Sequence, residues 1–173
     1  MSDMKNRWIA LYVENQVGVL AKVSGLFSAK SYNLQSLTVG TTEDESVSRM
    51  TICVTSDDIT FEQIKKQLNR MVEVIKVIDL TDVPLHMKEI LFARVTGLDS
   101  EGRIKLFQIA EVFNAGSGSI KPVDMNSDSV ILESTLTEHR NNDLIALLKA
   151  NFKQVSIVRG GAVAIESIST GCR

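Results

Sequence analysis

The chain has 173 residues, of which 44% are hydrophobic, 23% are charged and 5% are aromatic. This composition is that of a globular protein with enough apolar residues for a core. The net charge of −2 excludes the bulk positive charge that dominates nucleic-acid affinity. The apolar runs are only a few residues long, well below the roughly 20 that a membrane-spanning helix needs.

The start of the chain and the cysteines indicate a cytoplasmic protein. Residues 1–7 lead straight into a β-like run, and no signal-peptide pattern precedes it. Cys53 and Cys172 lie far apart without metal-ligand spacing, so both are predicted to be reduced thiols in a reducing compartment.

The first half of the chain predicts four strands and two helices. Strands are predicted over residues 8–13, a β-rich run, and over residues 33–39, 49–55 and 74–80, of which 49–55 alternates with period two. Apolar residues at helical spacing follow the first strand, and a second helix is predicted to begin at a capping box of Thr60 and Gln63. The order β-α-β-β-α-β predicts an α+β, ferredoxin-like domain, whose antiparallel sheet carries both helices on one face.

The same order of elements recurs after a linker at residues 81–86, where Pro84 interrupts the pattern. Strands are predicted over residues 90–95, 119–123, 130–135, 155–158 and 162–165, with helices starting at Ser100 and around Leu144. We therefore expect two ferredoxin-like βαββαβ domains, covering residues 1–80 and 87–173.

The sequence shows no catalytic constellation. His86 falls in the linker and His139 in a polar stretch that is predicted to be a loop, so both are expected to be solvated. None of the common nucleophile, zinc or phosphate-binding motifs occurs. We therefore expect neither enzymatic activity nor a metal site.

The turn between the first strand and the first helix is the candidate binding site. Its glycine permits close approach of the backbone, and the first amides of the helix are unpaired donors that suit a carboxylate. Asn15 and Asn33, expected at the same end of the sheet, offer side-chain amides for an amino group. The candidate residues are Asn15, Gly18, Val19, Leu20, Asn33 and Leu34. This set favours a small aliphatic α-amino acid, with ordinary turn chemistry as the alternative.

Two surfaces are candidates for contact with a partner. Trp8, Ala10, Tyr12 and Cys53 fall on the sheet face that the helices should leave open, and this face is apolar. Gly25 lies inside a helix beside small residues, which suits close approach by another backbone.

Three segments, at residues 14–28, 32–39 and 48–52, resemble the small regulatory subunit of acetolactate synthase (acetohydroxyacid synthase). The resemblance runs from Ile9 to Leu80, where the chain is similar to the ACT domain of that family. It continues more loosely at residues 113–115, 146–149 and 159–164. Ser31 departs from it, since the family commonly has glycine there, and the stretch 116–119 is unusual.

The resemblance implies a non-catalytic subunit of valine, leucine and isoleucine biosynthesis. Such a subunit activates the large catalytic subunit and confers feedback inhibition by valine. Thiamine diphosphate, magnesium and FAD would belong to the large subunit, and no cofactor to this chain. Valine would lie between the ACT domains of a homodimer, contacted by Asn15, Gly18, Val19 and Leu20 of one chain and by Asn33 and Leu34 of its neighbour. The second domain reads Gly97-Leu98-Asp99 at the equivalent turn, and no valine site is expected there.

Three other classes of function remain open at this point. An RNA-recognition domain shares the element order, but it needs aromatic residues on the central strands, and Arg49–Cys53 has none. An enzyme would need a nucleophile that the sequence does not reveal. A stand-alone ACT-type amino-acid sensor acting on another enzyme would differ by failing to co-purify with a thiamine-dependent subunit.

Overall fold

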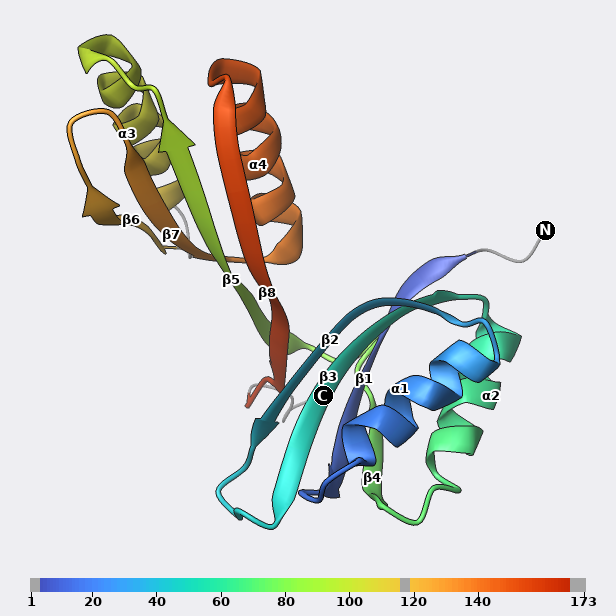
Figure 1. Cartoon of the computed structure of the whole chain (residues 1–173). Helices are drawn as coiled ribbons and strands as arrows, with labels where there is room; N and C mark the ends of the chain where they lie inside the picture. The colour runs from blue at the N-terminus through green and yellow to red at the C-terminus, as the bar shows by residue number, and fades with distance from the viewer. Residues whose placement is uncertain (1–3, 116–118, 169–173) are drawn as a thin grey trace. The chain divides into compact units, whose positions relative to one another are not determined.

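The computed structural model describes residues 4–115 and 119–168 (Figure 1). Its elements in chain order are β1 (Lys5–Glu14), α1 (Val19–Ala29), β2 (Asn33–Thr41), β3 (Val47–Ser56), α2 (Asp58–Leu68), β4 (Val74–Asp79), β5 (Leu85–Thr96), α3 (Ser100–Asn114), β6 (Ser119–Met125), β7 (Val130–Leu136), α4 (Glu138–Asn151) and β8 (Gln154–Glu166). The βαββαβ order therefore occurs twice, and the predicted α+β fold class is confirmed.

The chain divides into two compact units. The second unit is Met87–Ala162, and the first holds the residues up to His86 together with those from Val163 on. The domain prediction assigned everything after residue 86 to the second domain, whereas the structure groups the end of β8 with the first unit. The cause lies in contacts of that segment, which are described below.

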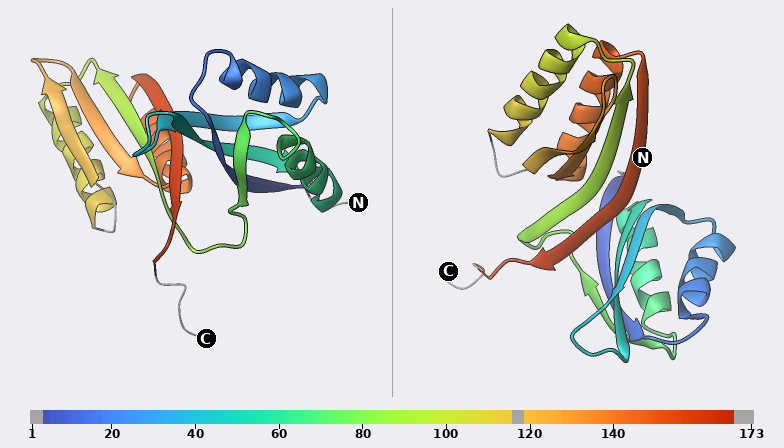
Figure 2. Two further views of the ribbon diagram at one scale, coloured as in Figure 1. Left: turned by 90° about the horizontal axis from the view of Figure 1, so that it is seen from below. Right: turned by 60° about the vertical axis from the view of Figure 1, so that its left-hand side comes forward.

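The first unit is a four-stranded antiparallel sheet in the order β2-β3-β1-β4, with α1 and α2 on one face (Figure 2). Ile9 pairs with Ile52 and Leu11 with Met50, so alternate side chains of β1 and β3 face the helices. These side chains form the core together with apolar residues of both helices. The predicted period-two pattern of β3 is thereby confirmed.

Helix α2 begins before the predicted capping box. Asp57 is its N-cap, and the carboxylate accepts a hydrogen bond from the Thr60 amide at 2.7 Å. Thr60 therefore lies in the first turn, and the capping-box prediction is wrong. Asp57 stands three residues before Thr60, which is the spacing that an N-cap acceptor requires.

Ser31, at the exit of α1, adopts a backbone conformation that favours glycine. It has a φ of 53°, which makes it the one non-glycine residue with positive φ in the described part of the chain. The amide of Tyr32 donates to the carbonyl of Phe27 at 3.0 Å across this bend. A side chain in the left-handed region is disfavoured, so the exit keeps its geometry and serine carries the strain.

The second unit is a four-stranded sheet in the order β6-β7-β5-β8, with α3 and α4 on one face (Figure 2). Its core contains Leu106, Leu144 and Leu148 from these helices. His139 lies in the first turn of α4 rather than in the predicted loop, and its side chain is exposed, as expected. In the unusual stretch, residues 116–118 lie outside the described residues and Ser119 begins β6.

The two predicted C-terminal strands form the single long strand β8. Gly160 lies against β5, where an added Cβ would come within 2.6 Å of Cγ2 of Ile90. Gly161 has a φ of 79°, which glycine adopts without strain. The glycine pair therefore lets β8 pass close to Ile90 of β5.

A buried charged network holds β5, β7, β8 and α4 together. Glu89 is 4% exposed, and its two carboxylate oxygens accept hydrogen bonds from Arg159 at 2.7 Å each. Asn141, fully buried, donates to Glu89 at 3.0 Å and accepts from the Ser134 hydroxyl at 2.8 Å. Buried charges require this kind of complete pairing.

The helix-free face of the first sheet is not as open as predicted. Ala10 and Cys53 are buried, while Trp8 and Tyr12 are half-buried. The segment after Val163 runs along the first unit, where the Ser167 amide donates to the Pro84 carbonyl at 2.9 Å. The segment from Val163 on therefore forms part of the surface on this side of the first unit. Cys172 lies outside the described residues.

Candidate functional site

The Asn15–Gly18 turn is fixed to the neighbouring β2–β3 hairpin. The Asn15 amide donates to the carbonyl of Ser46 at 2.7 Å, and its Nδ2 donates to the carbonyl of Glu45 at 2.8 Å. Two hydrogen bonds from one residue define both the position of the backbone and the direction of the side chain. The side-chain carbonyl oxygen of Asn15 remains available as an acceptor.

Gly18 opens the start of helix α1. It is the N-cap with a φ of 89°, and no side chain caps the helix. The Val19 amide donates to the Gln16 carbonyl at 3.3 Å. A Cβ atom added at Gly18 would meet no other atom within 4 Å. The remaining first-turn amides have no helical acceptor, so they form a site that suits a carboxylate.

A charged pair lies beside this turn. Lys22 in α1 forms an ion pair with Glu73, whose backbone carbonyl accepts from the Glu14 amide at 2.9 Å. The hydrogen bond from Lys22 lowers the pKa of Glu73, so this carboxylate is charged at neutral pH. The pair connects α1 to the segment before β4, next to the turn.

The predicted site residues do not meet within one chain. Asn15 follows Glu14, which pairs with Val47, whereas Asn33 pairs with Thr55 at the opposite end of β3. The expectation that Asn15 and Asn33 share one end of the sheet is therefore wrong. Helix α1 causes the separation, because its 11 residues carry the chain about 16 Å along the sheet before β2 begins.

The apolar candidates divide between core and surface. Val19 is 4% exposed and Leu34 packs against the core, so their side chains stabilise the fold. Leu20 is 43% exposed and Val17 is fully exposed beside the turn. The aliphatic surface next to the turn is thus formed by Val17 and Leu20, while Val19 offers its backbone.

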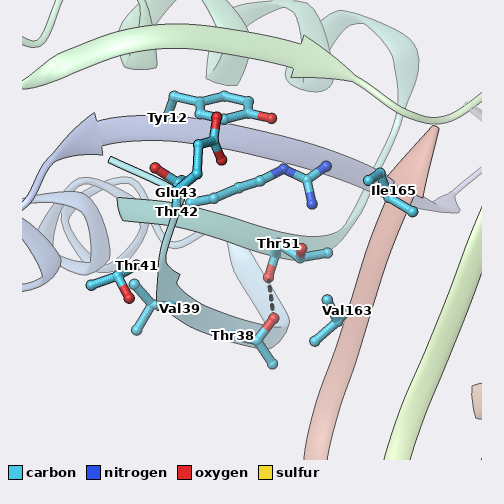
Figure 3. A pocket seen from close by; sticks show the side chains of 11 residues that line it. Tyr12, Thr38, Val39, Thr41, Thr42, Glu43, Thr51, Val163 and Ile165 are labelled. Atoms are coloured by element: carbon cyan, nitrogen blue, oxygen red, sulfur yellow. Dashed lines mark hydrogen bonds between the residues drawn. The ribbon is translucent and has the colours of Figure 1, made fainter. Parts of the chain in front are cut away.

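The structure also places Arg49 at a cavity that the sequence did not predict. This cavity, of about 330 Å³, lies where Tyr12, Arg49 and Thr51 of the first sheet approach Val163 and Ile165 of β8 (Figure 3). The Arg49 guanidinium donates to the carbonyl of Ala164, lies 3.4 Å from the Glu166 carboxylate and stacks over Tyr12. The only sequence signal was a cation within an otherwise uncharged strand.

Two kinds of feature are absent from the described residues, a cluster of metal ligands and a membrane-spanning helix. Within 4–115 and 119–168, no group of three or more His, Cys, Asp or Glu residues could hold a metal ion. No helix in the same ranges is long and apolar enough to cross a membrane.

The βαββαβ fold and its open helix start define a regulatory domain of the ACT class. Residues 9–76 match the family model described as the AHAS small subunit-like ACT domain, and residues 88–168 match the model described as the small subunit of acetolactate synthase. Together the two matches cover most of both units.

Individual relatives agree over nearly the whole chain. The acetolactate synthase small subunit of Aquifex aeolicus is 40% identical over 163 residues, which are 94% of this chain and 82% of the relative. The acetolactate synthase small subunit of Haemophilus influenzae is 35% identical over 92% of this chain and 94% of the relative. The crystal structure of the small subunit from Thermotoga maritima superposes with a TM-score of 0.83 at 33% identity, covering 96% and 99% of the two chains. The chain belongs to the family of acetolactate synthase small subunits, which makes it a non-catalytic regulatory subunit.

Proposed function

We propose that this chain binds the catalytic large subunit of acetolactate synthase, activates it and makes it sensitive to feedback inhibition by valine. Membership of the small-subunit family supports the choice of partner. Thiamine diphosphate, magnesium and FAD would then bind to the large subunit, and the complex would act in the cytoplasm. Its pathway would be the synthesis of valine, leucine and isoleucine.

The valine site would form between two copies of the first unit. Asn15 and Asn33 lie at opposite ends of one sheet, so a single chain cannot present both to one small molecule. Two chains related by a two-fold axis bring the Asn15 end of one toward the Asn33 end of the other. Strand β2, which carries Asn33, is an edge strand and is accessible to such a neighbour.

The open helix start is the observation that carries this proposal. The uncapped amides after Gly18 would donate hydrogen bonds to the valine carboxylate, and the valine ammonium group would donate one to the Asn15 side-chain oxygen. Val17 and Leu20 would contact the isopropyl group. Selectivity over leucine and isoleucine would be modest, because one methylene is worth about 1–3 kcal/mol.

Inhibition would follow from a preference of valine for one arrangement of the dimer. If the large subunit is most active with the other arrangement, valine opposes activation without touching the catalytic centre. A coupling free energy of about 1–3 kcal/mol is typical of such regulation.

Reconstitution with the large subunit tests the proposal. Acetolactate formation is measured across a valine titration with the wild-type chain and with Asn15→Ala. Because the variant loses an acceptor for the ammonium group, we expect half-inhibition at about tenfold higher valine, equivalent to about 1.4 kcal/mol. Activation without valine should stay within about twofold.

Asn151→Ala is the matched control, since it removes an asparagine side chain that bonds only the Leu147 carbonyl at the end of α4, in the second unit. An inhibition curve for Asn15→Ala that superposes on the wild-type curve would contradict the site. A chain that leaves acetolactate formation unchanged at all valine concentrations would instead favour the stand-alone sensor.

A further inference from the structure

The cavity on the helix-free face of the first sheet combines charged, hydroxyl and aliphatic groups. Its volume of about 330 Å³ is within the range of small-molecule sites. Figure 3 shows the side chains around it, and every lining residue belongs to the first unit. The lining residues are Tyr12, Thr38, Val39, Gly40, Thr41, Thr42, Glu43, Arg49, Thr51, Val163 and Ile165.

Two opposite charges border the cavity without pairing with each other. The ion-pair partner of Arg49 is Glu166, at 3.4 Å, and its other contacts are the Ala164 carbonyl and the Tyr12 ring. Two of its five N–H donors are used in these bonds, so donors remain. Within residues 4–115 and 119–168, Glu43 makes no ion pair.

The aliphatic part of the lining is accessible. Val39, Val163 and Ile165 are 46%, 60% and 60% exposed, although they lie around one hollow. Such side chains lower their free energy when an apolar group covers them. The threonine hydroxyls beside them, for example those of Thr41 and Thr51, supply neutral hydrogen-bonding groups.

We propose that this cavity binds a small aliphatic α-amino acid, at a second site separate from the Asn15–Gly18 turn. The carboxylate of the ligand would bind Arg49, its ammonium group would bind Glu43, and its side chain would cover Val39, Val163 and Ile165. A cation and an anion on one cavity distinguish a zwitterion from a simple acid or amine. None of the turn residues lines this cavity.

The end of β8 is part of the site. Val163 and Ile165 supply two of the three aliphatic walls, and Arg49 fixes the backbone between them through the Ala164 carbonyl. The ligand would therefore bind only when this segment lies on the sheet. Glu43 belongs to the β2–β3 hairpin that also bonds Asn15, so the two sites are connected through this hairpin.

Calorimetry on the full chain tests the proposal with three probes. L-valine carries both charges, 3-methyl-2-oxobutanoate lacks the ammonium group and 2-methylpropylamine lacks the carboxylate. The measurements use the Asn15→Ala variant, in which valine binding at the turn is weakened. The same variant is also combined with Val163→Trp, which fills the cavity from an exposed position. We expect Asn15→Ala to retain one saturable valine site per chain, with both truncated probes at least about tenfold weaker.

Addition of Val163→Trp should abolish that remaining site, whereas Val158→Trp, an exposed valine of β8 outside the cavity, should leave it unchanged. In the Asn15→Ala chain, Glu43→Gln should weaken the binding of valine about tenfold and leave the binding of the oxo acid unaffected. The proposal is overturned if the Asn15→Ala chain binds no valine, or if the Val163→Trp combination binds it unchanged. It is also overturned if Glu43→Gln weakens the binding of valine and of the oxo acid equally. The inhibition assay for the turn is independent of these outcomes.

Discussion

The two units share one fold but differ at the turn before their first helix. In the first unit Gly18 is the N-cap of α1, and no side chain occupies the helix start. In the second unit the Gly102 amide of α3 donates a hydrogen bond to the Asp99 carboxylate at 2.7 Å. A fixed carboxylate at a helix start satisfies its amides and repels a second carboxylate. The same scaffold is therefore open to an anion in one copy and closed by its own side chain in the other.

The units also differ in how they bury charge. The first unit buries the single cation Arg7, which lies over the Phe61 ring and pairs with the exposed Asp58. The second unit instead buries the carboxylate of Glu89, with Arg159, Asn141 and Ser134 around it. The first unit thus depends mainly on apolar packing, and the second also depends on a network that fails if one member is lost.

The largest effect is expected for Arg159→Met, which leaves the buried Glu89 without its cation. Breaking one side of a buried pair typically costs about 3–5 kcal/mol, and the partial exposure of Arg159 places the loss near the lower end, at about 3 kcal/mol. Urea unfolding followed by circular dichroism measures it. Arg94→Met, at an exposed strand position, should change the free energy of unfolding by less than about 0.5 kcal/mol. Equal losses in the two variants would contradict the role of the network.

Gly18→Ala tests the open turn directly. A side chain at a φ of 89° costs about 1–2 kcal/mol, even though a Cβ would meet no atom within 4 Å. Thermal unfolding should therefore show a lower midpoint for this variant. Gly40→Ala also has open space but no positive φ, so it should be nearly neutral. If both variants unfold like the wild type, the left-handed turn does not form in solution.

Asp99→Ala removes the group that closes the second helix start. Loss of an N-cap typically costs about 1 kcal/mol, and Asp57→Ala in α2 of the first unit should cost a similar amount. Denaturant midpoints of the two variants compare the caps directly. A negligible change in Asp99→Ala alone would show that the second turn is held by other contacts.

The smallest effect concerns the acid response of Asp79. Burial raises the pKa of this carboxyl group. Hydrogen bonds from Lys65 at 2.8 Å and Thr81 at 3.0 Å lower the pKa by more than burial raises it, so the net pKa lies below the ordinary value of 3.8. The unfolded chain then binds the proton more tightly. Stability from this group is complete above about pH 4 and is lost as the pH falls through the lowered pKa.

Asp79→Asn should remove that acid dependence and cost less than about 1 kcal/mol at neutral pH, because solvent screens a partly exposed pair. Unfolding free energies measured from neutral to acid pH test the slope. Asp82→Asn, at an exposed residue, is the control. An unchanged slope in Asp79→Asn would contradict the lowered pKa.

Patterns within single elements were predicted well, and relations between elements were not. Met50, Ile52 and Val54 face the core because alternation along a strand fixes the face. Thr60 was mistaken for a cap because Asp57 competes for the same helix start and wins through its carboxylate. The placement of Asn33 beside Asn15 failed because the length of α1, rather than the adjacency of motifs, decides which ends of the strands meet.

By itself the sequence determined the order of strands and helices, the core faces and the glycine turn, since each follows from spacing along one segment and from backbone conformation. The tertiary structure decided which turn stays open, where Asn33 lies relative to Asn15, and that the end of β8 belongs to the first unit. The last of these depends on contacts between residues more than a hundred positions apart, such as Arg49 and Ala164. No local pattern encodes such a contact, because its free energy exists only once the sheet has formed.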